Sequence, residues 1–297
     1  MQPRDALAFY TFVTHRTSAV VIKSYSTSFG LASRLLGGDV RQHVETVYAL
    51  VRVADEVVDG AAAAAGLSPD QTREVLDGLE AETERAMATG YSANPVVHAF
   101  ANTARETGIT AELTRPFFAS MRADLDRTEH SQESFDEYVY GSAEVVGLMC
   151  LKCFLYQEVP QPNAAQEQKF VDGARRLGAA FQKINFLRDL ADDFESLGRS
   201  YFPGIRPGNF GEADKHRLLD DIAADLAVSA AALRDLPGSS RRAVALAQGL
   251  FAELSIRLRN TPAEELLSSR VRVPNPVKLR IAARALAGRV PQPDETP

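Results

Sequence analysis

The chain reads as a series of helices separated by short breaks that contain proline or glycine. The main breaks fall at Pro160–Asn163, Pro203–Gly211 and Pro237–Ser240. Between them, segments of roughly 15 to 30 residues place their apolar positions close to a 3.6-residue period. No alternating apolar and polar runs joined by hairpin turns are evident. The pattern therefore predicts an all-α fold.

Several segments carry the residue types of a helix start. An N-cap residue followed three positions later by a side chain that can bond back is typical of a capping box, and proline is favoured in the first helical turn. We expect such starts at Ser68-Pro69-Asp70-Gln71 after the Ala61–Ala65 run, at Ser134 with Glu137, at Thr261-Pro262 with Glu264, and at Asn275-Pro276, whose helix ends near Gly288.

No break is long or polar enough to separate two domains, and no repeat of fixed period is present. We expect a single domain over residues 1–297, with a core from about residue 16 to residue 288 and a polar tail over 289–297. A chain of this length can bury one large core.

The first residues mix Arg4, Asp5, His15 and Arg16 into apolar sequence, which is not the pattern of a signal peptide. The longest apolar stretch, Val145–Leu155, contains a lysine and is well short of the about 20 residues that a membrane span needs. We therefore expect a cytoplasmic protein.

The only cysteines, Cys150 and Cys153, are too few for a disulfide framework. Their spacing is compatible with a metal or redox pair, but no second pair or nearby histidine completes such a site. We interpret them as two small buried residues of an apolar helix.

The charge balance is acidic, because 33 lysines and arginines face 39 aspartates and glutamates for a net charge of −6. Nucleic-acid-binding proteins usually carry a basic stripe, so we expect no nucleic-acid partner. Neither a GxGxxG nor a GxxxxGK[ST] motif is present. The remaining question is whether the carboxylates are spread for solubility or gathered for chemistry.

One group of acids lies in Val44–Gly60. Arg52, Asp55 and Asp59 fall within an arc of about 60° at 100° per residue, and Tyr48 projects into the same arc. This arc borders an apolar helical stripe formed by Val44, Val47, Tyr48, Val51 and Val58. Acids beside a buried stripe should line a cavity, although this segment alone is also compatible with a solvated helix edge.

A second group lies in Phe181–Glu195. Its polar arc of about 80° contains Gln182, Asn185, Asp189 and Asp193, flanked by Arg188 and Asp192. Apolar residues fill the rest of the helix. Two acidic faces of this kind in one all-α chain favour a functional site over two solvated edges.

Carboxylates one helical turn apart repel each other, and a hard divalent cation relieves that repulsion. Mg²⁺ prefers oxygen ligands and is often held by a few carboxylates together with substrate phosphates. Two such pairs suggest Mg²⁺ ions that bridge the protein to a diphosphate. Arg52, Arg188 and Arg199 could also bind the diphosphate, since guanidinium groups donate hydrogen bonds to phosphate oxygens. An apolar cavity would then shelter the cation left after the diphosphate departs.

With these residues, the chain resembles the squalene/phytoene synthases, the head-to-head branch of the trans-prenyltransferases. RVADEVVD at 52–59 resembles the first aspartate-rich motif of the family, and NFLRDLADDFESLGRSYFP at 185–203 resembles the second. YSTSF at 25–29 is similar to the N-terminal serine motif, and YVYGSAEVVGLM at 138–149 to the tyrosine and glycine helix. The four blocks stand in the family's order and cover roughly residues 20 to 205.

The resemblance implies an all-α isoprenoid-synthase fold around a central cavity, and it assigns roles to residues that match the family's motifs. The implied metal ligands are Asp55, Asp59, Asn185, Asp189 and Asp193. The implied diphosphate-binding residues are Tyr48, Arg52, Arg188, Arg199 and Arg270. The implied cavity residues are Ser26, Ser28, Phe29, Tyr138, Val146, Gly147, Gln182 and Tyr201. The implied catalytic set is Asp55, Asp59, Asp189, Asp193, Arg52 and Tyr201.

Two positions depart from the family pattern. Phe251 stands where some members have tyrosine, so a hydroxyl assigned there is missing or supplied elsewhere. Glu144 places an acid where glycine is common.

DEVVDG at 55–60 resembles phytoene synthases more than squalene synthases. The expected reaction is a Mg²⁺-dependent head-to-head condensation of two geranylgeranyl diphosphates. It would pass through a cyclopropylcarbinyl diphosphate to phytoene, with release of diphosphate. Mn²⁺ could replace Mg²⁺, and no NADPH is expected because the reaction ends in proton loss.

Two alternatives remain open at this stage. One is a C30 enzyme acting on farnesyl diphosphate, and the other is a degenerate homologue that serves as a binding or assembly factor. A head-to-tail synthase or a terpene cyclase would more typically show a DDxxD motif, which DEVVD is not. For either enzyme we expect a monomer with peripheral membrane contact, because substrate and product are long apolar chains.

Overall fold

Helices make up nearly all of the regular structure of the computed structural model, which describes residues 3–156, 158, 160–192 and 198–290. In those residues strand pairing is limited to one isolated bridge between Glu129 and Ser200. The expectation of an all-α fold is therefore confirmed. The helices are α1 (Pro3–Tyr25), α2 (Thr27–Ser33), α3 (Gly38–Val58), α4 (Ala61–Ala64), α5 (Pro69–Thr89), α6 (Pro95–Thr107), α7 (Ala111–Asp126), α8 (Gln132–Val139), the π-helical turn η1 (Tyr140–Glu144), α9 (Val145–Phe154), α10 (Ala164–Arg188), the 3₁₀ turn η2 (Pro207–Asn209), α12 (Glu212–Leu233), α13 (Gly238–Asn260), α14 (Ala263–Leu266) and α15 (Asn275–Leu286).

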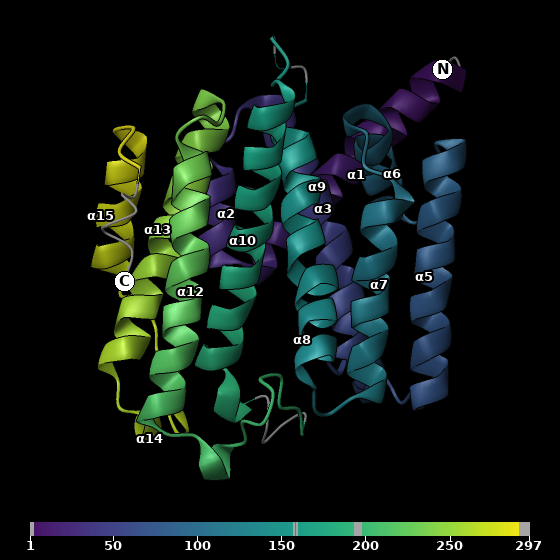
Figure 1. Ribbon diagram of the computed structural model, residues 1–297. Helices are drawn as coiled ribbons and strands as arrows, with labels where there is room; N and C mark the ends of the chain where they lie inside the picture. Colours follow the sequence, from purple (N-terminus) through teal and green to yellow (C-terminus); the bar gives the residue numbers. More distant parts are fainter. Residues whose placement is uncertain (1–2, 157, 159, 193–197, 291–297) are drawn as a thin grey trace.

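The long helices stand side by side with their axes roughly aligned, and α10 lies near the middle of the bundle (Figure 1). It packs against α9, η1, α12 and α13, while α3 packs against α1, α6, α7 and α9. Separate apolar clusters form on the α10–α12–α13 side and on the α3–α6–α7–α9 side. The central helices are therefore enclosed from both sides. None of the described helices has the length and apolar run needed to cross a bilayer.

Two of the predicted helix starts are confirmed. The Ser68 side chain accepts from the Gln71 backbone N–H and the Gln71 side chain accepts from the Ser68 N–H, which is a complete capping box. The last helix begins at Asn275, and Gly288 follows its end with φ of +75°.

At the other two positions a helix begins nearby, α8 at Gln132 and α14 at Ala263, but the predicted capping residues are wrong. Ser131, and not Ser134, caps α8, because the Ser134 hydroxyl can itself bond back to the Ser131 N–H as a glutamate would. Thr261 ends α13, and its hydroxyl donates to the Arg257 carbonyl in the last turn of that helix.

Both cysteines are free thiols on α9, as expected for an apolar helix. Cys153 is buried and Cys150 is partly buried, and burial raises the pKa of the Cys150 thiol to about 12. Thiols with so high a pKa are poor nucleophiles. The expected start of the core near residue 16 falls within α1, where buried side chains begin at Thr14.

Glycines allow the rod formed by η1 and α9 to lie directly on α10. A Cβ on Gly178 would come within 2.4 Å of the Ala143 carbonyl oxygen, and a Cβ on Gly147 within 2.4 Å of the Ala174 carbonyl oxygen. Either side chain would force the two backbones apart.

We therefore expect Gly178→Ala to destabilise the protein by about 1–3 kcal/mol, because the added methyl overpacks a backbone contact. Urea unfolding monitored by circular dichroism measures the change. The matched control is Gly78→Ala in α5, which has open space around it and should gain up to about 1 kcal/mol from helix propensity. Equal stability of Gly178→Ala and the native protein would contradict the close approach.

Candidate functional site

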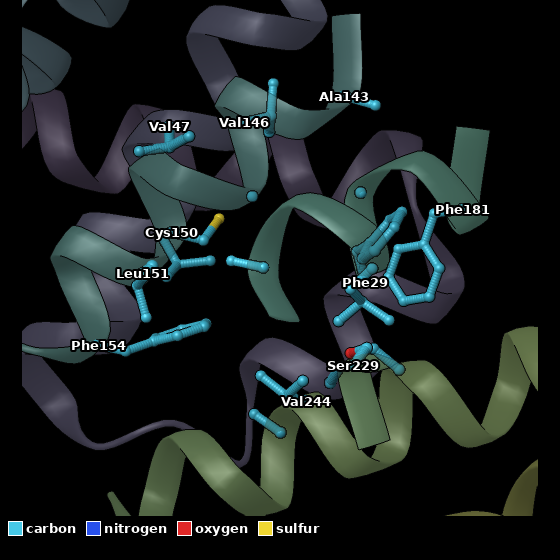
Figure 2. Close-up of a pocket in the computed structure, with 18 of the residues that line it drawn as sticks. Phe29, Val47, Ala143, Val146, Cys150, Leu151, Phe154, Phe181, Ser229 and Val244 are labelled. Carbon is cyan, nitrogen blue, oxygen red and sulfur yellow. The ribbon is translucent and has the colours of Figure 1, made fainter. Parts of the chain in front are cut away.

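A largely apolar cavity of about 300 Å³ lies between α3, α9 and α10 and is completed by α2, α12 and α13 (Figure 2). One face of α10, here called the α10 stripe, contributes residues at alternating intervals of three and one. The α10 stripe consists of Phe170, Gly173, Ala174, Leu177, Gly178, Phe181, Gln182 and Asn185. From α3 the cavity receives Val44, Val47, Tyr48 and Val51, four of the five residues of the predicted apolar stripe.

The structure sorts the predicted cavity residues into two groups. Residues that do line the cavity are Phe29, Val146, Gly147 and Gln182. The others lie outside it: Ser26, Ser28, Tyr138 and Tyr201. Ser26 instead caps α2, where its hydroxyl accepts from the Phe29 N–H at 3.0 Å.

Aromatic rings from three helices meet at the cavity wall. Phe181 and Phe251 stack with centroids 3.9 Å apart, and Phe29 lies within 5.8 Å of both. Phe251 therefore fills its position by ring packing. The second departure, Glu144, pairs with Arg175 at 2.6 Å and does not line the cavity.

The first acidic face lies where α3 ends. Arg52 donates to Asp55 at 2.6 Å and also to Glu56. The Asp55 side chain is 33 % exposed. Burial and the neighbouring Asp59 carboxylate raise the pKa of Asp55 to about 7, even though Arg52 lowers it. The charged form of Asp55 is therefore disfavoured here in spite of its pairing with Arg52.

Arg199 joins the second motif to the first. The residue is 7 % exposed, and its guanidinium donates to the Asp59 carboxylate at 3.1 Å, the Val58 main-chain carbonyl at 3.1 Å and the Asp124 main-chain carbonyl at 2.9 Å. A further contact of 3.3 Å reaches the Tyr201 hydroxyl. Through Arg199 the ends of α3 and α7 are fastened to the loop before η2.

Asp124 is a residue of this region that the sequence analysis missed. It is buried on α7 and accepts from the hydroxyls of Tyr138 at 2.7 Å and Tyr201 at 3.2 Å. Burial raises its pKa to about 6, although Arg199 lowers it. Asp124 follows Phe117 and Met121 at helical spacing, so an acid on a buried stripe was the sequence signal for it.

Tyr138 and Tyr201, predicted to line the cavity, belong to this buried cluster instead. Tyr201 stacks on Phe186 with centroids 4.0 Å apart, and Tyr138 lies 5.3 Å from Tyr201. Both phenols thus hold the Asp124 carboxylate.

The second acidic face is not one continuous helix, contrary to the prediction. α10 ends at Arg188, Asp189 has non-helical angles (φ −101°, ψ 10°), and residues 190–192 are helical again. Asp189 is paired with Arg188 at 2.8 Å and with Arg270 at 2.8 Å. These two pairs hold the residue where the helix axis breaks.

The predicted metal ligands are only partly described. Asn185 lines the cavity, Asp55 and Asp59 lie at the end of α3, and Asp193 lies outside the described residues. Among the residues that the structure covers, no group of three or more His, Cys, Asp or Glu side chains is gathered in metal-ligand geometry. Four of the predicted diphosphate-binding residues form ion pairs with predicted metal ligands. Arg52 pairs with Asp55, Arg199 with Asp59, and both Arg188 and Arg270 with Asp189.

The sequence matches one protein-family model and several proteins of known name. The family model described as squalene/phytoene synthase matches residues 22–205, which is more than half of the chain. A phytoene synthase of Mycobacterium tuberculosis is 28% identical over 297 residues, covering 93% of this chain and 91% of the relative. A phytoene synthase of Arthrospira platensis is 32% identical over 203 residues, covering 65% of this chain and 63% of the relative.

Solved structures support the same fold. A dehydrosqualene synthase crystal structure aligns with a TM-score of 0.77 at 22% identity and covers 94% of this chain and 97% of that one. The squalene synthase HpnC from Alicyclobacillus acidocaldarius aligns with a TM-score of 0.70 at 18% identity, covering 84% and 94%. With the family model, the relatives and the fold in agreement, the chain belongs to the squalene/phytoene synthase family and is a prenyltransferase with a single-domain all-α fold.

Proposed function

We propose that this prenyltransferase is a phytoene synthase that joins two geranylgeranyl diphosphates head to head, through a cyclopropylcarbinyl diphosphate, and releases diphosphate. The observation that carries the proposal is an apolar cavity lined by Val51 and Asn185, each of which is followed four residues later by an aspartate that is paired with arginine, Asp55 and Asp189. A diphosphate needs the charged end, and a polyprenyl chain needs the apolar wall. Relatives that cover most of the chain are named phytoene synthase.

The acidic residues fit a hard divalent cation, Mg²⁺ or Mn²⁺. Asp55, Asp59, Asn185 and Asp189, with Asp193, offer only oxygen donors, which these ions prefer. Burial first, and the neighbouring Asp59 carboxylate second, raise the pKa of Asp55, and a bound cation would favour its charged form. When bound, such ions neutralise diphosphate oxygens and favour departure of the leaving group.

The arginines at this end supply donors for the same diphosphate. The Arg52 Nε–H is buried and has no hydrogen-bond partner among the described residues, although the other two nitrogens of the guanidinium contact Asp55 and Glu56. A buried donor without a partner costs free energy that an anionic ligand would recover. Arg188 and Arg270 reach Asp189 from partly exposed positions, so they can also donate to phosphate oxygens.

The apolar wall performs two tasks in this reaction. It keeps water away from the carbocation, which would otherwise be quenched to an alcohol. Phe29 and Phe181 line the cavity, and their π electrons can stabilise positive charge.

The proposal is tested by incubating the purified protein with Mg²⁺ and either geranylgeranyl or farnesyl diphosphate, without NADPH. We expect phytoene from the C20 substrate, identified by its absorbance spectrum and mass. A C30 hydrocarbon from farnesyl diphosphate alone would make the protein a C30 enzyme. If neither substrate releases diphosphate, the proposed function is wrong.

The Asp55 carboxylate should lower the stability of the metal-free protein, although turnover should depend on it. Its pKa is raised in the folded protein above its ordinary value, so the folded state loses stability as pH rises from about 4 through about 7. In EDTA at pH 8, Asp55→Asn should therefore stabilise the protein by about 1 kcal/mol, or roughly 2–3 °C, after allowance for solvent screening. At pH 4 the difference should vanish. Thermal unfolding at the two pH values measures the effect.

The same substitution should lower turnover by about 1000-fold or more, since it removes a carboxylate that would hold the divalent cation on which departure of the diphosphate depends. Asp189→Ala should abolish turnover as well, with its helical circular dichroism intact. Glu56→Gln is the matched control: it removes a neighbouring acid that also contacts Arg52 but is absent from the predicted metal set. Substantial residual activity in Asp55→Asn would remove this residue from the metal site.

We also propose that α15 rests on an anionic lipid surface. Residues 270–289 contain six lysines and arginines and no acid, although the whole chain has a net charge of −6. On α15, Leu279 and Leu286 are 67% and 60% exposed. α15 lies on the outer side of α13 at one edge of the bundle (Figure 1). Exposed leucines flanked by basic side chains are typical of interfacial helices.

Sedimentation with vesicles tests this contact. The protein should bind vesicles that contain phosphatidylglycerol, and Leu279→Ser combined with Leu286→Ser should weaken binding by about tenfold. Val20→Ser on α1, where the native valine is 62% exposed, is the control and should bind normally. Equal partitioning of the native protein with and without vesicles would rule the contact out.

A further inference from the structure

Over residues 5–20, α1 has polar side chains inside and large apolar side chains outside. The helix packs on α3 and α6, and in this stretch the residues it buries are Thr14, His15 and Ser18. On its outer face, Phe9 and Phe12 are 59% and 55% exposed. A helix at the surface of a globular protein usually turns its apolar side to the core, so α1 is reversed.

Specific contacts hold α1 in this orientation. The Tyr10 hydroxyl donates to the main-chain carbonyls of Ser92 and Ala93 at 3.1 and 3.0 Å, just before α6 begins. The Thr11 hydroxyl lies 2.9 Å from His98 Nε2 on α6. Turning α1 to bury its outer face would break these contacts. The phenylalanines therefore stay in water as long as the chain is alone.

The outer face of α1 forms a continuous stripe, here called the α1 stripe. At 100° per residue its members lie within an arc of about 100°. The α1 stripe consists of Asp5, Phe9, Phe12, Val13, Arg16, Val20 and Lys23, all of which are exposed. Its apolar members thus stand between an acid at the start of the helix and a base near its end.

The α1 stripe lies where another molecule can reach it. The N-terminal end of α1 extends past α5 and α6 at one corner of the bundle (Figure 1). A free phenylalanine side chain has on the order of 200 Å² of surface, so the two half-exposed rings leave roughly 200 Å² in water. With the valines, the stripe is comparable to the largest apolar patch of a typical monomer, which is often a binding surface.

The order of charges along the α1 stripe fits a second copy of the same helix. Two copies packed antiparallel, with a two-fold axis near the level of Thr14, place Asp5 of each chain opposite Lys23 of the other. The same register places Phe9 beside Val20. Opposite charges and apolar side chains are therefore paired by one symmetric arrangement.

We propose that the protein forms a homodimer in which the two α1 stripes pack antiparallel. Near the axis, each Arg16 guanidinium can contact the Phe12 ring of the other copy, as it already lies 5.7 Å from the centre of its own Phe12 ring. The sequence led us to expect a monomer, and the reversed helix favours a dimer instead. This inference is independent of the reaction proposed above.

The observations favour a protein partner over a lipid surface for the α1 stripe. Interfacial helices carry basic residues around their apolar face, and residues 270–289, which include α15, have that character with no acid. The α1 stripe instead contains Asp5. In Figure 1, α15 lies at the left edge of the bundle and the projecting end of α1 at the upper right, so the two surfaces are well separated.

The main test is the double variant Phe9→Ser with Phe12→Ser, studied by sedimentation equilibrium from about 1 μM to about 200 μM protein. Because the interface is small, the native protein should dimerise with a Kd of about 10 μM. The double variant should raise Kd by at least about 100-fold, since a dimer buries four of these rings. Its helical circular dichroism should be unchanged, because both rings are exposed in the single chain.

Leu279→Ser combined with Leu286→Ser is the matched control. It also removes two large exposed apolar side chains, but from α15, and should leave Kd for dimerisation unchanged. The two double variants should therefore separate the two surfaces. The α1 variant loses the dimer and keeps vesicle binding, and the α15 variant does the reverse.

Charge reversal tests the antiparallel register. Lys23→Glu places an acid opposite Asp5 of the other copy, twice in each dimer, and should raise Kd by about fivefold at low ionic strength. Adding Asp5→Lys should restore the native Kd, because the pair is then reversed. In a parallel dimer Lys23 would face its own counterpart, so failure of the second change to restore Kd would overturn the antiparallel arrangement.

Three results would overturn the dimer itself. The native protein could remain monomeric up to about 200 μM, well above the expected Kd. A dimer could persist in the variant that lacks Phe9 and Phe12, which would place the interface elsewhere. That variant could also lose vesicle binding with no change in mass, which would make the α1 stripe a lipid contact. None of these results bears on whether the protein forms phytoene.

Discussion

A single buried guanidinium fastens the charged end of the cavity. Arg199 donates to main-chain carbonyls in the last turns of α3 and α7 and to the Asp59 carboxylate. Helix C-termini carry partial negative charge, so a cation placed there is stabilised by both helices together. Removing it would leave Asp124 buried among carbonyls and phenols without its principal counter-charge. The positions of Asp59 and Tyr201 both depend on this contact.

The rest of the site is built on the distance between backbones. Gly147 and Gly178 let the rod formed by η1 and α9 lie directly on α10, and these helices together with α3 wall the apolar cavity. The charged end and the apolar wall are thus separate parts of one arrangement, one fixed by electrostatics and the other by close packing.

Sequence periodicity predicted the walls of the cavity well. Val44, Val47, Tyr48 and Val51 repeat at helical spacing, and local spacing is enough to place them on one face. It failed where a distant contact decides the local structure. Asp189 ends α10 beside Arg270, which is 81 residues away, and no short-range pattern reveals such a partner.

The sequence pointed to Tyr138 and Tyr201 as residues of the site, but it did not predict where in the site they lie. Tyr138 and Tyr201 were expected at the cavity, but Asp124, which holds both, is 14 residues from one and 77 from the other. An acid on a buried stripe shows that a partner must exist, because a buried carboxylate is costly alone. It does not show which phenols will supply it.

The π-helical turn η1 has a consequence for how such an enzyme can diversify. A π turn adds one residue to an α-helix, so the rod formed by α8 and α9 changes rotational phase at Tyr140–Glu144. Before the turn, Tyr138 faces the buried acid of α7; after it, Val146 and Gly147 face the cavity. The two halves of this helical rod therefore present their side chains to different parts of the protein. Changes in the α9 half can alter the cavity wall, while the α8 half keeps the Tyr138 hydroxyl on Asp124.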